Sequence, residues 1–258
     1  MPSILLEIKN NIAFVTLNRP EKFNSFNHEM ALSFQEQLKD ADSNKEVRCV
    51  YITGAGKAFC AGQDLAEVVD PSGPGMDKIL VEHFNPIVTI IRNLSKPVVA
   101  AVNGVAAGAG ANIALCCDVV VAAESASFIQ AFSKIGLIPD SSGTFFLPRL
   151  IGFQNASALM MLGDKVNGID AQKSGMVYRV FADNVFEEES IKLATTLAAM
   201  PTKALYFIKQ ALNKSVIQNL EQQLETEDDF QQKSAATNDF KEGVQAFLEK
   251  RIPIFKGE

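Results

Sequence analysis

Three stretches of small residues have the composition of a site that binds a ligand through its backbone. They read GAGKAFCAGQDL at 54–65, NGVAAGAGANI at 103–113 and GLIPDSSGT at 136–144, and the first two directly follow a predicted strand. Ligands of open α/β sheets favour loops at the carboxyl ends of strands. Small residues let a ligand approach the backbone, and a following helix leaves free N–H groups at its start. Two such loops side by side can aim two N–H donors at one oxygen.

Asp140 is the acidic residue of the third stretch, and the pattern leaves two interpretations open. The run PDSSG at 139–143 is typical of a helix N-terminus, where a capping Asp140 would have a lowered pKa. A role as general base instead needs Asp140 buried among apolar groups, which the flanking Leu137 and Phe145 permit.

The sequence lacks the motifs of nucleotide-binding sites, metal sites and catalytic triads. Glycines 104, 108 and 110 have the wrong order for a dinucleotide-binding G-x-G-x-x-G, and no Walker A pattern is present. The two histidines, His28 and His83, lie far apart in the sequence without ligand spacing, so we expect no metal site and no Ser-His-Asp triad. His28, at the start of a predicted helix, is expected on the surface.

The composition narrows the class of protein further. The 258 residues contain 24 Lys+Arg against 30 Asp+Glu, a formal net charge of −6, which provides no basic footprint for nucleic acid or an anionic membrane. No apolar run reaches the ~18 residues of a transmembrane helix. The four cysteines form no C-x-x-C pair, which favours buried reduced thiols and a cytoplasmic location.

Predicted strands and helices alternate in the first half of the chain. Segments rich in β-branched residues predict strands at 4–8, 12–17, 48–53, 97–102, 119–123 and 177–182. Apolar periodicity predicts helices at 28–41, 78–94, 156–162, 170–174, 187–200, 203–214, 217–232 and 239–250. This alternation indicates an α/β fold with mostly parallel strands. The Pro- and Gly-rich segment 70–77 is expected to be a loop or mobile lid.

The chain is predicted to divide into a core, residues 1–195, and a helical C-terminal region, residues 196–258. The last two predicted helices carry apolar stripes on otherwise charged sequence. Such stripes pack against a core or form a subunit interface, and the sequence leaves both open.

Taken together, the motifs resemble the enoyl-CoA hydratase/isomerase (crotonase) superfamily over nearly the whole chain. They are LNRPEK at 17–22, FCAGQDL at 59–65, PVVAAVNG at 97–104, GAG at 108–110, AFSKIGLIPD at 131–140 and EGVQAFLEKR at 242–251. The resemblance implies a crotonase-like spiral of ββα units with a helical C-terminal trimerisation region, assembled as a homotrimer or dimer of trimers. Within the superfamily, DPSGP at 70–74 and FLPR at 146–149 are most similar to isomerases that act on a ring epoxide of phenylacetyl-CoA.

The resemblance assigns roles to individual residues. The backbone N–H groups of Gln63 and Ala109 match the two donors that hold the thioester oxygen of an acyl-CoA while an enolate forms. Asp140 matches the acid of isomerase-type members. The two glutamates of hydratases, which position a water molecule, are replaced by Asn112 and Phe132. The resemblance thus implies an isomerase that shuttles a proton with one carboxylate.

Contacts with the substrate follow in the same way, and no cofactor is implied because CoA is part of the substrate. The residues that match substrate- or CoA-binding positions are Lys22, Ala61, Gly62, Asp64, Leu65, Gly108, Phe132, Leu137, Phe255 and Lys256. Two alternatives stay open: an enoyl-CoA hydratase of fatty-acid β-oxidation, and an acyl-CoA binder without catalytic activity.

Overall fold

A tight turn connects the first two predicted strands in the computed structural model, which describes residues 2–258. Asn10 and Asn11 have positive φ angles of 52° and 63°, a conformation in which asparagine is favoured in tight hairpin turns. The turn joins two antiparallel strands, β1 (Ile4–Lys9) and β2 (Ile12–Leu17).

The main sheet has six strands in the order β1-β2-β3-β5-β7-β10, and every pair except β1–β2 is parallel. All five residues of β5 are buried, as expected for a parallel strand covered on both faces. The strands added here are β3 (Cys49–Gly54), β5 (Val98–Val102), β7 (Val119–Ala123) and β10 (Arg179–Phe181). The predicted α/β class and mostly parallel pairing are confirmed.

A second sheet of four very short strands was not predicted from the sequence, because three residues are too few to show a period. Its order is β4 (Ala58–Cys60), β6 (Val105–Ala107), β8 (Ser127–Ile129) and β9 (Lys165–Asn167). Each of β3, β5 and β7 is followed by one strand of this sheet and then by helix. These repeated ββα units form the expected spiral.

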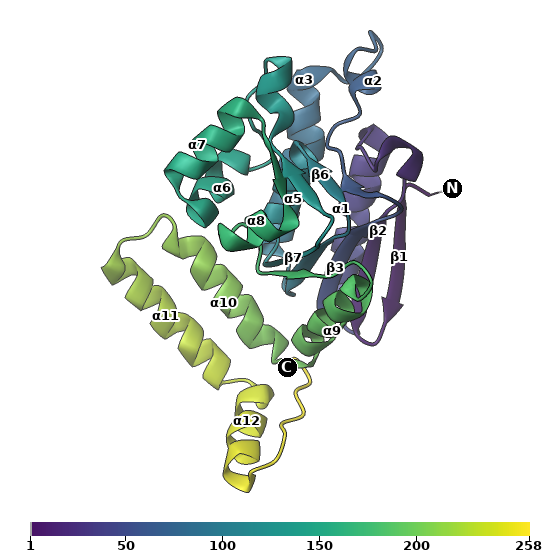
Figure 1. Ribbon diagram of the computed structural model, residues 1–258. Helices are drawn as coiled ribbons and strands as arrows, with labels where there is room; N and C mark the ends of the chain where they lie inside the picture. The colour runs from purple at the N-terminus through teal and green to yellow at the C-terminus, as the bar shows by residue number, and fades with distance from the viewer. Residues whose placement is uncertain (1) are drawn as a thin grey trace.

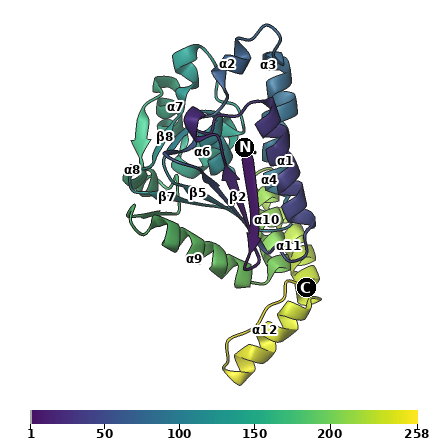
Figure 2. The same ribbon diagram turned by 90° about the vertical axis from the view of Figure 1, so that its right-hand side faces the viewer.

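Helices cover both faces of the main sheet, with α1 (His28–Ser43) and α4 (Asn85–Asn93) on one side and α9 (Phe186–Ala199) on the other (Figure 2). The helix predicted over 78–94 is present, but it is not α-helical throughout. The chain instead forms α3 (Gly75–Lys78), a π-helical turn η2 (Ile79–Phe84) and then α4. The expected loop at 70–77 is correspondingly shorter, because α3 begins at Gly75.

The remaining helices of the core include α6, which begins at the helix N-terminus predicted within 139–143 and has Pro148 in its interior. They are η1 (Pro20–Lys22), α2 (Leu65–Val68), α5 (Ala109–Leu115), η3 (Ala131–Ile135), α6 (Gly143–Ile151), α7 (Phe153–Leu162) and α8 (Gly168–Lys173). No helix within residues 2–258 is long and apolar enough to cross a membrane. All four cysteines are buried and free, as predicted.

Three helices follow the core, and the last one extends away from it (Figures 1 and 2). They are α10 (Thr202–Ser215), α11 (Leu220–Ala235) and α12 (Asn238–Glu249). Helix α10 packs on α4, and α11 lies along α10, where the rings of Phe207 and Phe230 stack at 5.3 Å. Residue 195 lies within α9, and the division into two regions stays a prediction.

Candidate active site

The first two small-residue loops pack directly against each other. Gly62 has a φ angle of 93°, and a Cβ atom there would lie 3.0 Å from the Ala107 carbonyl oxygen and 3.2 Å from the Ala109 nitrogen. At Gly110, in the first turn of α5, a Cβ atom would collide with the carbonyl of Cys60. Side chains are excluded at these contacts, so the small residues are required for the two backbones to meet.

Two backbone N–H groups are left free where these loops meet. Phe26 forms hydrogen bonds on either side of Gln63, donating to the Gly62 carbonyl at 2.7 Å and accepting from the Asp64 N–H at 2.7 Å. This bridge fixes the Gln63 backbone without using its N–H. Ala109 is the first residue of α5, so its N–H has no partner within the helix. Within residues 2–258, neither N–H donates a hydrogen bond.

Asp140 does not cap α6, so the capping interpretation is wrong. The helix begins after Ser142, which takes a left-handed conformation with φ of 66°. The Asp140 carboxylate accepts one hydrogen bond, from the Ser141 hydroxyl at 2.8 Å. Burial raises the pKa of Asp140 above its usual value, and the Ser141 hydroxyl partly opposes the shift. A partly desolvated carboxylate with a raised pKa has the properties of a general base.

Asn112 holds the backbone of Asp140 in place. Its buried side-chain amide donates to the Asp140 carbonyl oxygen at 2.8 Å and accepts from the Gln130 amide at 2.8 Å. At Gly143 a Cβ atom would collide with this amide, so the third loop also packs closely here. Asn112, which the resemblance places where hydratases have their first glutamate, thus fixes the loop that carries Asp140.

An apolar pocket of about 370 Å³ contains the two free N–H groups and Asp140. Nine of the thirteen predicted site residues line it: Ala61, Gly62, Gln63, Leu65, Gly108, Ala109, Phe132, Leu137 and Asp140. Six further residues, which no motif assigned to the site, also line the pocket: Val68, Met76, Ile79, Phe84, Ala131 and Ile135. Asp140 is the only carboxylate among these lining residues.

The other four predicted site residues lie outside this apolar pocket. Lys22 is exposed, and Asp64 pairs with Arg19 at 3.0 Å while it caps α2. The tail is held by its own chain: Arg48 donates to the Phe255 carbonyl, and Asp239 accepts from the Lys256 N–H at 2.7 Å. Their contacts with CoA stay predictions.

The two histidines, distant in the sequence, are brought together. His28 Nδ1 and His83 Nε2 lie 2.8 Å apart, so His28, which was expected on the surface, is half-buried and pairs with the second histidine. Neither histidine lines the apolar pocket, but His83 directly precedes Phe84, which does.

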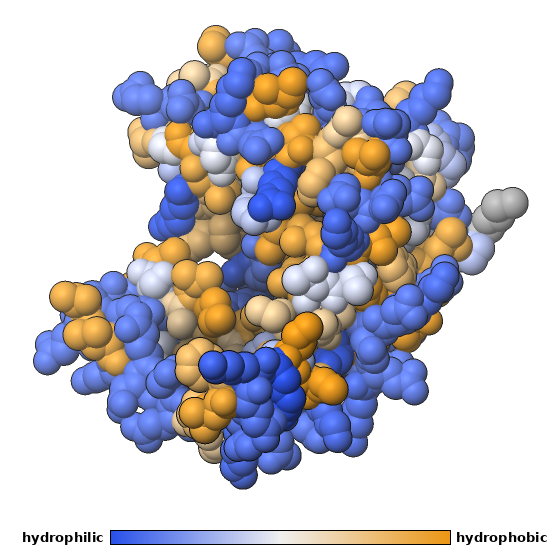
Figure 3. All heavy atoms as spheres, turned by 60° about the horizontal axis from the view of Figure 1, so that its bottom comes forward, coloured by the Kyte–Doolittle hydropathy of each residue, from blue (hydrophilic) through white to orange (hydrophobic). Residues whose placement is uncertain are grey.

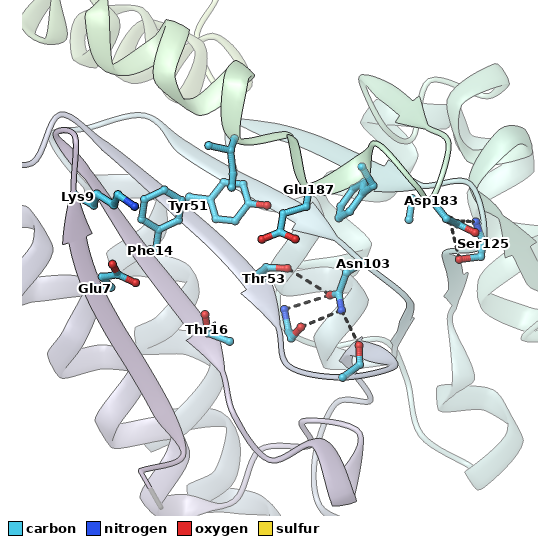
Figure 4. A pocket seen from close by; sticks show the side chains of 15 residues that line it. Glu7, Lys9, Phe14, Thr16, Tyr51, Thr53, Asn103, Ser125, Asp183 and Glu187 are labelled. Carbon is cyan, nitrogen blue, oxygen red and sulfur yellow. Dashed lines mark hydrogen bonds between the residues drawn. The ribbon is translucent and has the colours of Figure 1, made fainter. Parts of the chain in front are cut away.

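A larger hollow of about 730 Å³ opens between the main sheet and α9 (Figure 4), and we call it the sheet hollow. Its most buried polar groups are already paired. The Asn103 side chain makes hydrogen bonds to both N–H and C=O of Gly54, and the Tyr51 hydroxyl lies 2.8 Å from the Ser190 hydroxyl. The hydrogen bonds of Asn103 are drawn in Figure 4.

The paired N–H donors, the one carboxylate that lines the apolar pocket and the ββα spiral define a class of enzymes that act on acyl thioesters. A sequence profile of the enoyl-CoA hydratase/isomerase family matches residues 7–258, and the chain belongs to that family.

Relatives with different names match the chain over its whole length. It is 46% identical over 261 residues to 1,2-epoxyphenylacetyl-CoA isomerase of Escherichia coli K12, covering 100% of both chains. It is 40% identical to a Rhodobacter capsulatus protein named "Probable enoyl-CoA hydratase", covering 99% of this chain and 98% of that one. The crystal structure of an enoyl-CoA hydratase from Bacillus anthracis superimposes with a TM-score of 0.91 at 33% identity, covering 99% and 100%.

Proposed function

We propose that this protein is an acyl-CoA isomerase that uses Asp140 alone to move a proton along the acyl group. The carrying observation is the apolar pocket itself, which combines two unused N–H donors with one partly desolvated carboxylate. The isomerase from Escherichia coli, 46% identical over its whole length, supports the same reaction class.

The reaction on a 3-enoyl thioester would proceed in two proton transfers. The Asp140 carboxylate removes a proton from C2, and the electron pair of that C–H bond delocalises onto the thioester oxygen. The N–H groups of Gln63 and Ala109 stabilise this oxygen, and each such donor typically contributes ~3 kcal/mol to lowering the barrier. The protonated Asp140 then returns the proton to C4, which leaves the double bond between C2 and C3.

The same proton transfer can convert a ring epoxide beside the CH₂ of an aryl acetyl thioester to an oxepin. The bond between the two epoxide carbons breaks to give the seven-membered ring. Asp140 removes the α-proton, so that charge builds up on the thioester oxygen, and returns it to a ring carbon as the exocyclic double bond forms. We propose this epoxide-to-oxepin isomerisation, in phenylacetyl-CoA breakdown, as the physiological reaction. Its support is the name of the Escherichia coli relative and the aromatic lining by Phe84 and Phe132.

Hydration is the second candidate, favoured by the names of two relatives. Addition of water to a 2-enoyl thioester needs groups that orient and deprotonate that water. Phe132 cannot do this, and the Asn112 amide is engaged with Gln130 and the Asp140 carbonyl. We therefore expect hydration to be slow relative to isomerisation.

For assembly, we propose a homotrimer or a dimer of trimers formed through the C-terminal helices. Apolar side chains are exposed there, including Leu220 at 75%, Phe247 at 83% and Ile252 at 86%. Orange patches on the face viewed in Figure 3 include this end of the molecule. Sedimentation equilibrium of the full chain measures the mass directly, and a monomer at micromolar concentration would contradict the proposal.

A paired spectrophotometric assay tests the activity. One cuvette follows loss of crotonyl-CoA by hydration, and the other follows conversion of trans-3-hexenoyl-CoA to its conjugated 2-enoyl isomer. We expect isomerisation at a rate well above hydration. Fast hydration would contradict the proposal, as would an Asp140→Asn variant with the full isomerisation rate. Binding of CoA esters with neither reaction would indicate a binder.

A further inference from the structure

The π-helical turn η2 (Ile79–Phe84) shapes one wall of the apolar pocket. The Asn85 N–H donates to the Leu80 carbonyl, an i→i+5 bond that is typical of π-helix. In an α-helix, residues five apart would point about 140° away from each other, since each residue turns by about 100°. The wider π-turn brings Ile79 and Phe84, which are five apart, to the same pocket, where both are buried.

Helix α1 holds this turn through two side chains. The Gln35 amide donates to the carbonyl oxygens of Glu82, at 2.7 Å, and His83, at 3.2 Å. His28 bonds to the ring of His83, whose side chain is fully buried. Neither Gln35 nor the two histidines line the pocket, so they act on it through the turn.

The proton count of the histidine pair makes the contact sensitive to protonation. One proton occupies the bond between His28 Nδ1 and His83 Nε2, and in the neutral pair the second can sit on His28 Nε2. A third proton can then go only to His83 Nδ1, which is buried with no hydrogen-bond partner within residues 2–258. A protonated pair therefore either breaks its bond or buries an unpaired N–H, and both are unfavourable.

We propose that His83, through its bond to His28, is a positioning residue that holds Ile79 and Phe84 against the acyl group, and that protonation of the pair releases this wall. The proposal rests on the acyl-CoA function proposed above and names a regulation of the same site.

Burial favours the neutral form of His83, and its charged neighbours modify this preference. The groups that face it are His28 of α1, Glu67 of α2 and Glu82 of its own turn. Burial lowers the pKa of His83, and the two glutamates partly oppose this while His28 adds to it. Acidification below the usual histidine range therefore loosens the wall.

Acyl-CoA affinity measured with matched variants tests the proposal. His83→Gln keeps an N–H donor at the same distance from Cβ but cannot titrate, whereas His28→Ala removes its partner at a less buried position. Glu36→Gln, on an exposed side chain of α1 that does not act on His83, is the control. The readouts are the calorimetric Kd of hexanoyl-CoA and of free CoA, and KM and kcat for trans-3-hexenoyl-CoA, between pH 5.5 and 8.5.

For the wild type we expect KM and the hexanoyl-CoA Kd to rise about three- to tenfold on acidification, with little change for free CoA. His83→Gln should keep the affinity measured at pH 8 and lose this rise. His28→Ala should have weakened acyl affinity at every pH, with kcat changed less than KM. An unchanged hexanoyl-CoA affinity in His28→Ala, or a wild-type rise that persists in His83→Gln, overturns the proposal.

An NMR titration gives a readout that needs no turnover and separates this inference from the proposed function. The chain has only two histidines, so two Cε1–H resonances report on the pair. We expect one histidine to titrate below the usual range and to shift when the other is substituted. Two independent titrations near pH 6.5 would overturn the inference even if the enzyme isomerises, whereas absence of isomerisation alone would overturn only the proposed reaction.

Discussion

The sheet hollow is the larger of the two cavities, but the apolar pocket has more polar groups without a hydrogen-bond partner. The sheet hollow has a volume of about 730 Å³ against about 370 Å³ for the pocket. In the hollow, Asn103 and Tyr51 already have partners in the chain. In the pocket, two N–H groups have none within residues 2–258, and Asp140 accepts a single hydroxyl bond. Polar groups without a hydrogen-bond partner, rather than a large volume, therefore indicate where a substrate can bind favourably.

Replacing one carboxylate in each cavity should give the largest difference between the two. Asp140→Asn removes the base, and we expect kcat for isomerisation to fall about 10²- to 10⁴-fold. Asp183→Asn is the matched control, because Asp183 lines the sheet hollow and accepts bonds from the N–H and hydroxyl of Ser125. Steady-state rates with a 3-enoyl-CoA decide the point. Equal losses in both variants would mean that the two cavities do not differ in function.

Disturbing the free donors should have the next largest effect. A methyl group at Gly62 would press on the Ala107 carbonyl and the Ala109 nitrogen, so Gly62→Ala should lower kcat about 10²- to 10³-fold. Gly152→Ala carries the same strain, with φ of 78°, but its Cβ would meet no atom within 4 Å. It should cost about 1–2 kcal/mol of unfolding free energy and leave kcat intact. A fully active Gly62→Ala enzyme would show that the backbone N–H groups do not contribute to catalysis.

Removing the main polar side chain of the sheet hollow should affect folding rather than turnover. Asn103→Ala leaves the Gly54 N–H and C=O without this partner, at a cost of about 1–3 kcal/mol. Urea unfolding measures this loss, and the isomerisation rate below the transition should match the wild type. If activity is lost while stability is kept, the sheet hollow has a role in function, and the difference inferred between the two cavities is wrong.

Asp140→Asn should also reveal a stability cost of the base. The pKa of Asp140 is raised in the folded protein, so its charge disfavours folding, and one pKa unit corresponds to about 1.4 kcal/mol. The folded state binds more protons between the unfolded and the folded pKa, so this cost appears as pH rises through that window. At pH 7 the melting temperature of Asp140→Asn should be at least as high as that of the wild type. A clearly less stable variant would mean that the carboxylate stabilises the fold.

The smallest effect is expected from Gln63→Ala, because the donor at this position is the backbone. The side-chain amide bonds to Glu67 at 2.8 Å, and losing one such contact costs about 0.5 kcal/mol, or a two- to threefold change in kcat/KM. A loss as large as that of Gly62→Ala would show that the side chain itself contacts the reacting group.

The sequence predicted those parts of the molecule that depend on local pattern or on family motifs. The β-branched runs gave β2 its observed bounds, and the motif residues Gln63, Ala109 and Asp140 do meet in one pocket. Periodicity could not reveal η2, because a short π-helical turn leaves the apolar spacing of 78–94 helical in appearance. The Asp140 cap was mispredicted because Ser142 takes a left-handed conformation that serine rarely adopts. The His28–His83 contact depends on tertiary packing between α1 and η2, which neither segment encodes alone.

The close packing at Gly62 and Gly110 means that substitutions can change the lining of the apolar pocket more easily than the position of the backbone donors. The donors are main-chain atoms fixed by contacts that exclude any side chain, so ordinary mutation offers no graded way to adjust them. The lining offers many such ways, since Met76 is 37% exposed and Ile135 is 55% exposed. Directed evolution for other acyl groups should therefore collect its useful changes in α3 and η3.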